Sequence, residues 1–275
     1  MQQMSPAFRT NESAAGPQQA CNRLYRYGGQ KVTDQPPDEL VALRDRLTAE
    51  TRITVLTGAG ISAASGIPTF RGGQDSLWQN HRPEELATPA AFNRDPELVW
   101  RWYDWRRGLI AQAEPNAAHR TLAHLQERCQ VQIVTQNVDG LHDRAGSRNV
   151  LEFHGSIWRV RCLSCGREET DERVPIPILP RCAQCHGLLR PGVVWFGESI
   201  APEILDASVD AARHCQVFVV IGTSGAVYPA AGLATVARES GARTLEFNLA
   251  PSEISSQMDI FVPGSAAETL PWLID

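Results

Sequence analysis

Apolar residues of this chain alternate between helix-like and strand-like spacing from Pro36 onward. Leu40, Leu43 and Leu47 recur at the spacing of a helix, and the β-branched run at 53–57 leads directly into a glycine turn. Further buried strands are predicted at 131–135, 217–222 and 244–248, and helical segments at 116–128, 201–214 and 229–240. Alternating strands and helices predict an α/β fold in which helices cover both faces of a parallel sheet.

Two stretches interrupt the alternation and predict a smaller domain inserted into the larger one. Residues 68–115 are rich in arginine and tryptophan and are predicted to be helical, whereas residues 158–192 are rich in cysteine. The large domain then comprises residues 36–67, 116–157 and 193–275. Together these segments form the catalytic region 36–275.

The first 35 residues are rich in Gly, Gln, Pro, Ser and Asn and show little apolar periodicity, which predicts a mobile N-terminal tail at 1–35. They hold no uninterrupted apolar segment of the kind that a signal peptide requires. Before Asp34, four basic residues against a single acidic one, Glu12, keep a transit peptide open as the second interpretation of this tail.

The composition is that of a soluble globular protein, with 43% hydrophobic residues and no apolar run near the 18 residues of a membrane span. A net charge of -5 and a pI near 5.8 exclude nucleic acid as the expected main ligand, although basic protein tails stay open as partners. Lys31 is the only lysine beside 25 arginines, a bias that indicates GC-rich coding and a bacterial source.

Four of the seven cysteines form two Cys-x-x-Cys pairs separated by 16 residues, the spacing of a structural zinc ribbon. The predicted ligands are Cys162, Cys165, Cys182 and Cys185. Four thiolates leave no position for water, so the metal should stabilise the insertion rather than catalyse. A redox role is the alternative, but it would need only one pair. An odd cysteine count with paired thiols favours a reducing compartment, and the cytoplasm is expected.

Three small residues, Gly58, Ala59 and Gly60, follow a predicted strand. Small side chains there would let backbone N–H groups approach a pyrophosphate at a helix N-terminus. A plain structural turn would use the same glycines. The segment 65–73 then breaks the helix early, unlike an ordinary dinucleotide-binding fold. A long loop is therefore expected to cover the nucleotide.

Polar residues also gather at 135–142, directly after a predicted strand, where open α/β sheets bind their ligands. Asn137 and Asp139 stand out, but both residue types also form turns and caps. His154 follows the apolar Phe153, and spacing alone favours a packed histidine over a base there.

Taken together, the motifs resemble the sirtuins, NAD-dependent protein-lysine deacylases, over roughly residues 50–270. The segments that carry the resemblance are Gly58-Ala59-Gly60-Ile61-Ser62, 66–72, 135–142, Phe153-His154-Gly155, the two cysteine pairs, Phe196-Gly197-Glu198 and Gly222-Thr223-Ser224. The resemblance implies a Rossmann-like large domain, a small domain bearing Zn²⁺, and a cleft between them where NAD meets an acyl-lysine of a protein substrate.

The resemblance also implies a role for each matching residue. His154 would be the general base, Phe70 would shield the reacting face, and Arg71 would lie near the phosphates or ribose. The remaining expected NAD contacts are Gly58, Ala59, Gly60, Gln136, Asn137, Asp139, Gly222, Thr223, Ser224, Asn248 and Ala266. The substrate peptide would add as a strand between Phe196-Gly197-Glu198 and Gly225-Ala226-Val227, with Val194 also in contact, and be recognised largely through its backbone.

Thr69 stands where many sirtuins have Asp, which resembles the desuccinylase and demalonylase branch (class III). Its signature pair is Tyr103 and Arg106, which a helix would place on one face to grip a carboxylate, while Ala87 would leave room for a longer acyl chain. From spacing alone, Tyr103 would instead pack in the core and Arg106 with Arg107 would form a solvated face.

The implied reaction removes succinyl, malonyl or glutaryl groups from lysine and yields nicotinamide and an O-acyl-ADP-ribose. A deacetylase with broad acyl tolerance is the first alternative. A mono-ADP-ribosyltransferase and a zinc-ribbon interaction module are the others. The sequence leaves the oligomeric state open.

Overall fold

The computed structural model describes residues 35–69 and 83–275. These residues belong to one compact unit. The predictions for the N-terminal tail up to residue 34, and for Phe70 and Arg71, lie outside the described residues.

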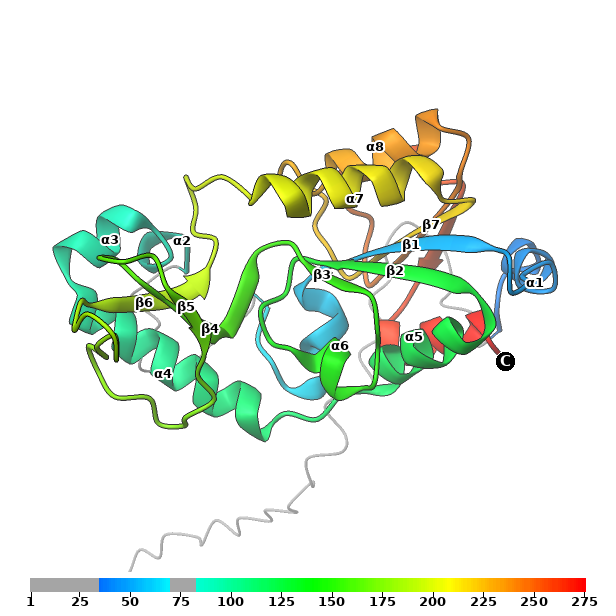
Figure 1. The fold of residues 1–275 in the computed structure, drawn as a ribbon. Coiled ribbons are helices and arrows are strands. Elements are labelled where there is room, and N and C mark those ends of the chain that lie inside the picture. Colours follow the sequence, from blue (N-terminus) through cyan, green and yellow to red (C-terminus); the bar gives the residue numbers. More distant parts are fainter. Residues whose placement is uncertain (1–34, 70–82) are drawn as a thin grey trace, which may run out of the picture. The chain divides into compact units, whose positions relative to one another are not determined.

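The described residues form a six-stranded parallel sheet with helices on both faces (Figure 1). Its strands, in spatial order, are β3 (Val150–Glu152), β2 (Gln130–Thr135), β1 (Arg52–Thr57), β7 (Val217–Ile221), β8 (Arg243–Asn248) and β9 (Ile260–Pro263). All five residues of β7 are buried, as expected for a central strand covered on both sides. The parallel α/β fold predicted from the sequence is thus confirmed.

Alternate side chains of the central strands pack into two separate hydrophobic cores, one on each face of the sheet. Val217, Val219 and Ile221 point to one face, whereas Phe218 and Val220 point to the other, as the period of a strand requires. The first face packs against α1 (Asp38–Arg44), α5 (Ala117–Arg128), α9 (Ala266–Thr269) and η4 (Leu270–Leu273). The second packs against α7 (Pro202–His214) and α8 (Gly232–Glu239), which lie together over the sheet in Figure 1.

A smaller antiparallel sheet has the strand order β5 (Glu168–Thr170), β4 (Gly155–Cys162) and β6 (Leu189–Val193). It shares a third core with α2 (Pro83–Leu86), α3 (Pro89–Arg94) and α4 (Pro96–Gln112). The Asp95 side chain accepts the backbone N–H of Leu98 and so caps α4, which explains why a long helix starts there. The helical prediction for 68–115 is therefore met by three helices between residues 83 and 112.

Two elements differ in detail from the sequence predictions. The segment after the Gly58 turn is the 3₁₀ helix η2 (Ala59–Ser65), which ends at Gly66 with φ +83°. The helix predicted from residue 229 begins only at Gly232, after a turn. Two short elements complete the described chain, α6 (Leu141–Arg144) and η3 (Ser255–Gln257).

Within the described ranges, no helix combines the length and apolarity needed to cross a membrane.

Candidate active site

The carboxyl ends of β1 and β7 lie side by side where the strand order changes direction. From β1 the sheet grows toward β2 and β3, and the chain then returns to β7 on the other side of β1. Open α/β sheets bind ligands in the crevice that such a reversal creates. The predicted glycine turn follows β1, and the predicted 222–224 segment follows β7, so both meet at this crevice.

The glycines allow the two loops to pack against each other. The Gly60 N–H donates to the Gly222 carbonyl at 2.8 Å, and the Gly58 N–H donates to that of Ile221 at 2.9 Å. A Cβ at Gly60 would lie 2.6 Å from the Gly222 Cα, and Gly222 itself has φ +58°. These glycines are required for the close approach of the loops, whatever the loops bind.

Polar side chains from three segments surround this crevice. The Gln136 amide donates to the Thr223 hydroxyl at 3.1 Å, and the Asn248 amide donates to the Thr223 carbonyl at 2.8 Å. Ser224 accepts the backbone N–H of Ala226, and Ala266 is buried at the start of α9. The structure therefore brings the ends of β2, β7 and β8 to one edge of the sheet.

A buried polar cluster lies beside the glycine turn. Asn137 donates to the Gly58 carbonyl and to the Ser62 hydroxyl, both at 3.1 Å, while Ser62 donates to the Asp139 carboxylate at 2.7 Å. Burial raises the pKa of Asp139 above its ordinary value, although hydrogen bonds from the Leu141 N–H and Ser62 oppose the rise. The sequence predicted Asn137 and Asp139 but assigned no role to Ser62, which joins them.

Two buried histidines extend the cluster and were also missed. His119 Nε2 lies 3.4 Å from the Ser62 hydroxyl, and His142 Nε2 lies 3.0 Å from that of Thr57. Burial lowers the pKa of His119 to about 4 and that of His142 to about 3. Both are therefore neutral near pH 7. The motif at 135–142 included His142, but only the three-dimensional contact with Thr57 distinguishes it from a surface residue.

His154 lies at the end of β3, half-buried, with its ring oriented by one hydrogen bond. Its Nδ1 lies 2.9 Å from the Gln136 carbonyl oxygen, which can only accept, so Nδ1 carries the proton and Nε2 is the basic nitrogen. Burial lowers the pKa of His154, and the hydrogen bond to Gln136 opposes that change. The arrangement provides a neutral imidazole able to take a proton at Nε2.

Tyr103 and Arg106 lie one turn apart on α4 and close to the polar cluster that contains Asp139. Tyr103 is buried, and burial raises its pKa to about 12. Burial lowers the pKa of Arg106, whereas the charges of Tyr103 and Asp139 raise it, so Arg106 lies within electrostatic range of both. Of the alternative drawn from spacing alone, the core position of Tyr103 agrees with the structure. The solvated face is wrong for Arg107, which is 1% exposed and donates to the Ile157 carbonyl at 2.8 Å.

The predicted peptide-binding segment follows β6 directly. The Val194 N–H donates to the His154 carbonyl and the Phe196 N–H to the Ala87 carbonyl, each at 2.9 Å. Phe196 is exposed, and Gly197 has φ +87°. The Glu198 carboxylate binds Arg190 and the Trp195 N–H, so its side chain serves the protein interior rather than an open strand edge.

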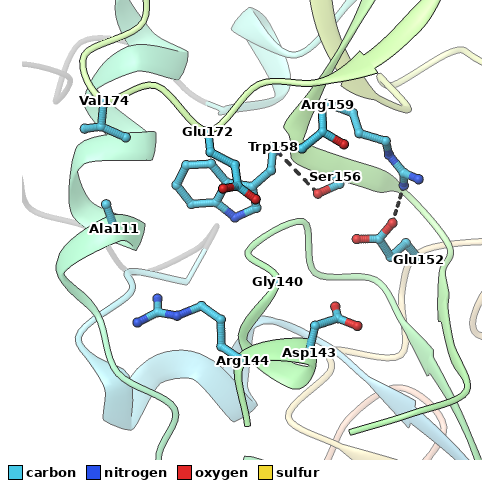
Figure 2. A pocket seen from close by; sticks show the side chains of 11 residues that line it. Ala111, Gly140, Asp143, Arg144, Glu152, Ser156, Trp158, Arg159, Glu172 and Val174 are labelled. Carbon is cyan, nitrogen blue, oxygen red and sulfur yellow. Dashed lines mark hydrogen bonds and ion pairs between the residues drawn. The ribbon is translucent and has the colours of Figure 1, made fainter. Parts of the chain in front are cut away.

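A cavity of about 610 Å³ lies apart from these residues, between α4, α6, β3 and β4 (Figure 2). Within residues 35–69 and 83–275, none of the side chains predicted for NAD, substrate or metal lines it. Its wall residue Trp158 donates to the Asp139 carbonyl at 2.9 Å, so the cavity backs onto the loop that carries Asp139.

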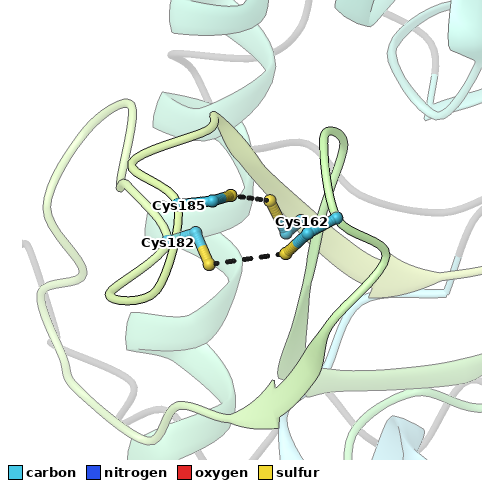
Figure 3. A group of neighbouring side chains, drawn as sticks. Cys162, Cys182 and Cys185 are labelled. Atoms are coloured by element: carbon cyan, nitrogen blue, oxygen red, sulfur yellow. Dashed lines mark hydrogen bonds between the residues drawn. The ribbon is translucent and has the colours of Figure 1, made fainter.

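The four predicted cysteine ligands converge at one end of the small sheet (Figure 3). Their sulfur atoms lie within 4.8 Å of one another, with Cys162 Sγ 3.4 Å from Cys185 Sγ and Cys165 Sγ 3.8 Å from Cys182 Sγ. Sulfurs bound to one zinc at about 2.3 Å in a tetrahedron lie about 3.8 Å apart. The cluster therefore fits a structural Zn²⁺.

Fold and site together define a dinucleotide-binding α/β protein with a four-thiolate metal site. Residues 58–229 match the model of the Sir2 family. An NAD-dependent protein deacylase of Aquifex aeolicus (strain VF5) is 52% identical over 225 residues, which cover 81% of this chain and 94% of that protein. The NAD-dependent protein deacylase 2 of Pyrobaculum aerophilum is 51% identical over 232 residues, which cover 84% and 93%.

Solved structures agree with this assignment. A crystal structure of a Sir2 homologue in complex with NAD has a TM-score of 0.81 and 44% identity, and the match covers 87% of this chain and 93% of that one. A Sir2–p53 peptide–NAD⁺ complex has a TM-score of 0.74 and 32% identity, covering 85% and 95%. The chain belongs to the Sir2 family, the sirtuins, and the family predicted from its motifs is thus confirmed.

Proposed function

We propose that this sirtuin is an NAD-dependent protein-lysine deacylase that prefers succinyl and malonyl groups, and accepts glutaryl. NAD-dependent protein deacylation follows from its membership of the Sir2 family and from relatives that carry that name. The preference for acidic acyl groups is the finer proposal. The observation that carries it is the pair of Tyr103 and Arg106, one helical turn apart and within electrostatic range of the Asp139 cluster.

The crevice residues fit NAD as cofactor. The loops after β1 and β7, whose Gly58, Gly60 and Gly222 N–H groups bond within the protein, meet at the switch point, where a dinucleotide is expected to bind. Asn137, Asp139 and Ser62 would hold the nicotinamide end, because their amide, carboxylate and hydroxyl groups are buried together. When bound, NAD supplies the activated ribose to which the acyl group is transferred.

His154 would act as the general base in this cleft. Its Nε2 is free of the proton that Nδ1 shares with Gln136, so it can accept one from a ribose hydroxyl. Its lowered pKa keeps the imidazole neutral near pH 7. The backbone of His154 also joins the proposed base to the peptide-binding segment, because the His154 carbonyl accepts the Val194 N–H.

An acidic acyl group would be selected by charge. Arg106 can donate to a terminal carboxylate, and the Tyr103 hydroxyl can add a second hydrogen bond. A succinyl or malonyl carboxylate would add a charge-assisted hydrogen bond to Arg106 that an acetyl group cannot make, which favours the acidic acyl groups. The substrate class is therefore protein lysines that carry a short dicarboxylic acyl group.

Broad deacetylation is the second candidate, and one observation favours it. The Arg106 guanidinium carbon lies 4.9 Å from the centroid of the Trp102 ring, and Tyr103 packs edge-on against the same ring at 4.7 Å. Such packing would suit purely structural roles for both residues. The two candidates predict different acyl preferences.

An acyl-peptide panel with NAD separates them. One peptide in acetyl, malonyl, succinyl and glutaryl forms is turned over, and the ADP-ribose product is identified by mass spectrometry. The proposal expects the highest kcat/KM for the acidic forms. Tyr103→Phe and Arg106→Met should each lower kcat/KM for these forms by an amount equivalent to about 2–5 kcal/mol of binding free energy, mostly through a higher KM. A preference for acetyl, or equal losses on acetyl and succinyl in both variants, would support the deacetylase instead.

A further inference from the structure

We propose that Trp195 is a positioning residue that aims the Tyr103 hydroxyl at the terminal carboxylate of the acyl group, and that Arg190 and Glu198 hold Trp195 in place. This inference rests on the proposed preference for acidic acyl groups. It gives a specificity role to three side chains that lie outside the acyl pocket's own signature pair.

The contact between Trp195 and Tyr103 fixes the direction of a proton. Trp195 Nε1 lies 2.9 Å from Tyr103 Oη, and both side chains are 3% exposed. An indole nitrogen can only donate, so the tyrosine oxygen is the acceptor in this hydrogen bond. A phenolic hydrogen lies near the plane of its ring and has two orientations there. The one that faces the indole N–H would set two donors against each other, so the hydroxyl hydrogen points away from Trp195.

The hydroxyl hydrogen is thereby available to a ligand. Among residues 35–69 and 83–275, Trp195 is the only hydrogen-bond partner of the Tyr103 hydroxyl. Burial keeps the phenol protonated, since its pKa is raised to about 12. Tyr103 is therefore a donor at any pH at which the enzyme would work. A carboxylate in front of it, with Arg106 one turn further along α4, would receive both a hydrogen bond and a countercharge.

The indole is held on its face by a buried cation. The Arg190 guanidinium carbon lies 3.5 Å from the centroid of the Trp195 ring, and the Arg190 side chain is 4% exposed. A guanidinium at this position over an indole is a favourable cation–π contact. The ring of Phe92 lies 5.2 Å away from that of Trp195 and packs against it as well.

The same cation is fixed by Glu198. Both terminal nitrogens of Arg190 donate to the two carboxylate oxygens of Glu198, one of them at 2.9 Å, and Arg190 also donates to the Val193 carbonyl at 2.9 Å. Glu198 further accepts the backbone N–H of Trp195 at 2.8 Å. Burial would raise the pKa of Glu198, but the hydrogen bonds from Arg190 and Trp195 outweigh it and lower that pKa. Ring and backbone of Trp195 are thus anchored by one ion pair.

The test removes the indole N–H and keeps an aromatic ring. Trp195→Phe is compared with wild type on the succinyl and acetyl forms of one peptide, with kcat and KM measured separately. The ratio of kcat/KM for succinyl over acetyl should fall about 10-fold, the size of one lost hydrogen bond, and mainly through KM for succinyl. Because both substrates share the peptide, effects on peptide binding cancel in the ratio.

Trp100→Phe is the matched control. Trp100 is equally buried in the same core, but its Nε1 donates to the Leu189 carbonyl at 3.0 Å rather than to Tyr103. This variant should keep the succinyl-to-acetyl ratio of wild type. An unchanged ratio in Trp195→Phe, with both rates lowered together, would overturn the proposal and leave Trp195 a packing residue.

Two further measurements complete the test. In a Tyr103→Phe background, Trp195→Phe should change the ratio by less than twofold, because the group it positions is already gone. If Trp195→Phe does not fold, Glu198→Gln tests the same chain of contacts: it loosens Arg190, and the ratio should fall, whereas an unchanged ratio would contradict the proposal. A wild type without any succinyl preference would instead refute the proposed function. Failure of the acyl preference is therefore distinguishable from failure of the positioning role of Trp195.

Discussion

A single carbonyl group determines what His154 can do. The Gln136 oxygen holds the proton on Nδ1, so the lone pair is on Nε2. A solvated histidine exchanges between both tautomers, whereas this one is fixed by the neighbouring β2 segment. Burial also lowers its pKa, which keeps the basic form populated in weak acid.

Replacement of His154 by Ala should lower the deacylation rate on the order of 10²–10⁴-fold, the usual contribution of a general base. The melting temperature should stay near that of wild type, because His154 is only half-buried. His214→Ala is a suitable control, since that side chain is 61% exposed at the end of α7.

The pH profile gives a second measure of the same role. Since the pKa of His154 is lowered from 6.5, the rate should hold below pH 6.5 and fall only as pH drops through the lowered value. Near wild-type turnover in folded His154→Ala would exclude His154 as the base.

The buried pair His119 and His142 should make stability depend on pH. Their folded pKa values, about 4 and about 3, lie below the ordinary 6.5, so the unfolded chain binds protons more readily. Stability is then fully present above pH 6.5 and is lost as pH falls toward those values, by about 2 kcal/mol for each histidine at pH 5. Urea unfolding at pH 7 and pH 5 measures this, and His142→Gln should reduce the difference. Equal stability at both pH values would contradict the prediction.

Sequence motifs predicted part of this chemistry and missed the rest for a physical reason. Asn137 and Asp139 follow a predicted strand, so their position along the chain already indicates the edge of the sheet, whereas only the resemblance to the sirtuins singled out His154. Ser62 meets Asp139 across 77 residues, and Trp195 meets Tyr103 across 92. Periodicity reports which face a residue occupies, but it carries no information on partners so far away in the chain.

At the scale of elements, the contact between the loops after β1 and β7 sets the shape of the crevice. Gly60→Ala would place a Cβ 2.6 Å from the Gly222 Cα, and the three nearest atoms all belong to the Gly222 backbone, which cannot move aside as a flexible side chain can. Such overpacking should lower the free energy of unfolding by about 1–3 kcal/mol and weaken NAD binding in calorimetric titration.

Gly108→Ala provides the contrast. Gly108 lies within α4, and a Cβ there would meet nothing within 4 Å. Alanine is favoured over glycine in a helix interior by about 1 kcal/mol, so this variant should be as stable as wild type or more stable. If Gly60→Ala were equally neutral, the close packing of the loops would not be a constraint.

The strands and helices were predicted well where apolar runs were long. β1, β2, β7 and β8 match the predicted strands to within a residue. β7 is continuously apolar, as a strand buried on both faces requires, whereas Glu246 interrupts the apolar residues of β8. The 3₁₀ geometry of η2 was not predicted, since small residues such as Ala63 and Ala64 suit an α-helix equally well. Its early end at Gly66 was indicated by the sequence.

At the scale of the whole molecule, the metal site should contribute to folding. Cys162→Ser, or removal of the metal by a chelator, should lower the melting temperature and abolish activity indirectly, because structural zinc adds its binding energy to stability. Metal analysis of purified protein should find zinc.

Cys215→Ser is the matched control for this prediction. Cys215 is buried beneath α7, and its thiol donates to the Ala212 carbonyl, a bond that a serine hydroxyl can also make. Retention of both melting temperature and activity in metal-free protein would exclude a structural role for the metal. Location in a reducing cytoplasm stays a prediction, consistent with the free thiols this site would need.

Strand β4 connects the candidate active site at His154 with the cysteine cluster, two sites with different chemistry. It begins at Gly155, the residue after His154, and ends at Cys162, the first of the four thiolates. The eight residues of β4 would span about 25 Å if fully extended, and its pairing with β6 is irregular between Gly155 and Val160. Its neighbour β6 leads into Val194, which is hydrogen-bonded to His154. The small sheet thus joins the cysteine cluster at one end to the segment that carries the proposed base, His154, at the other.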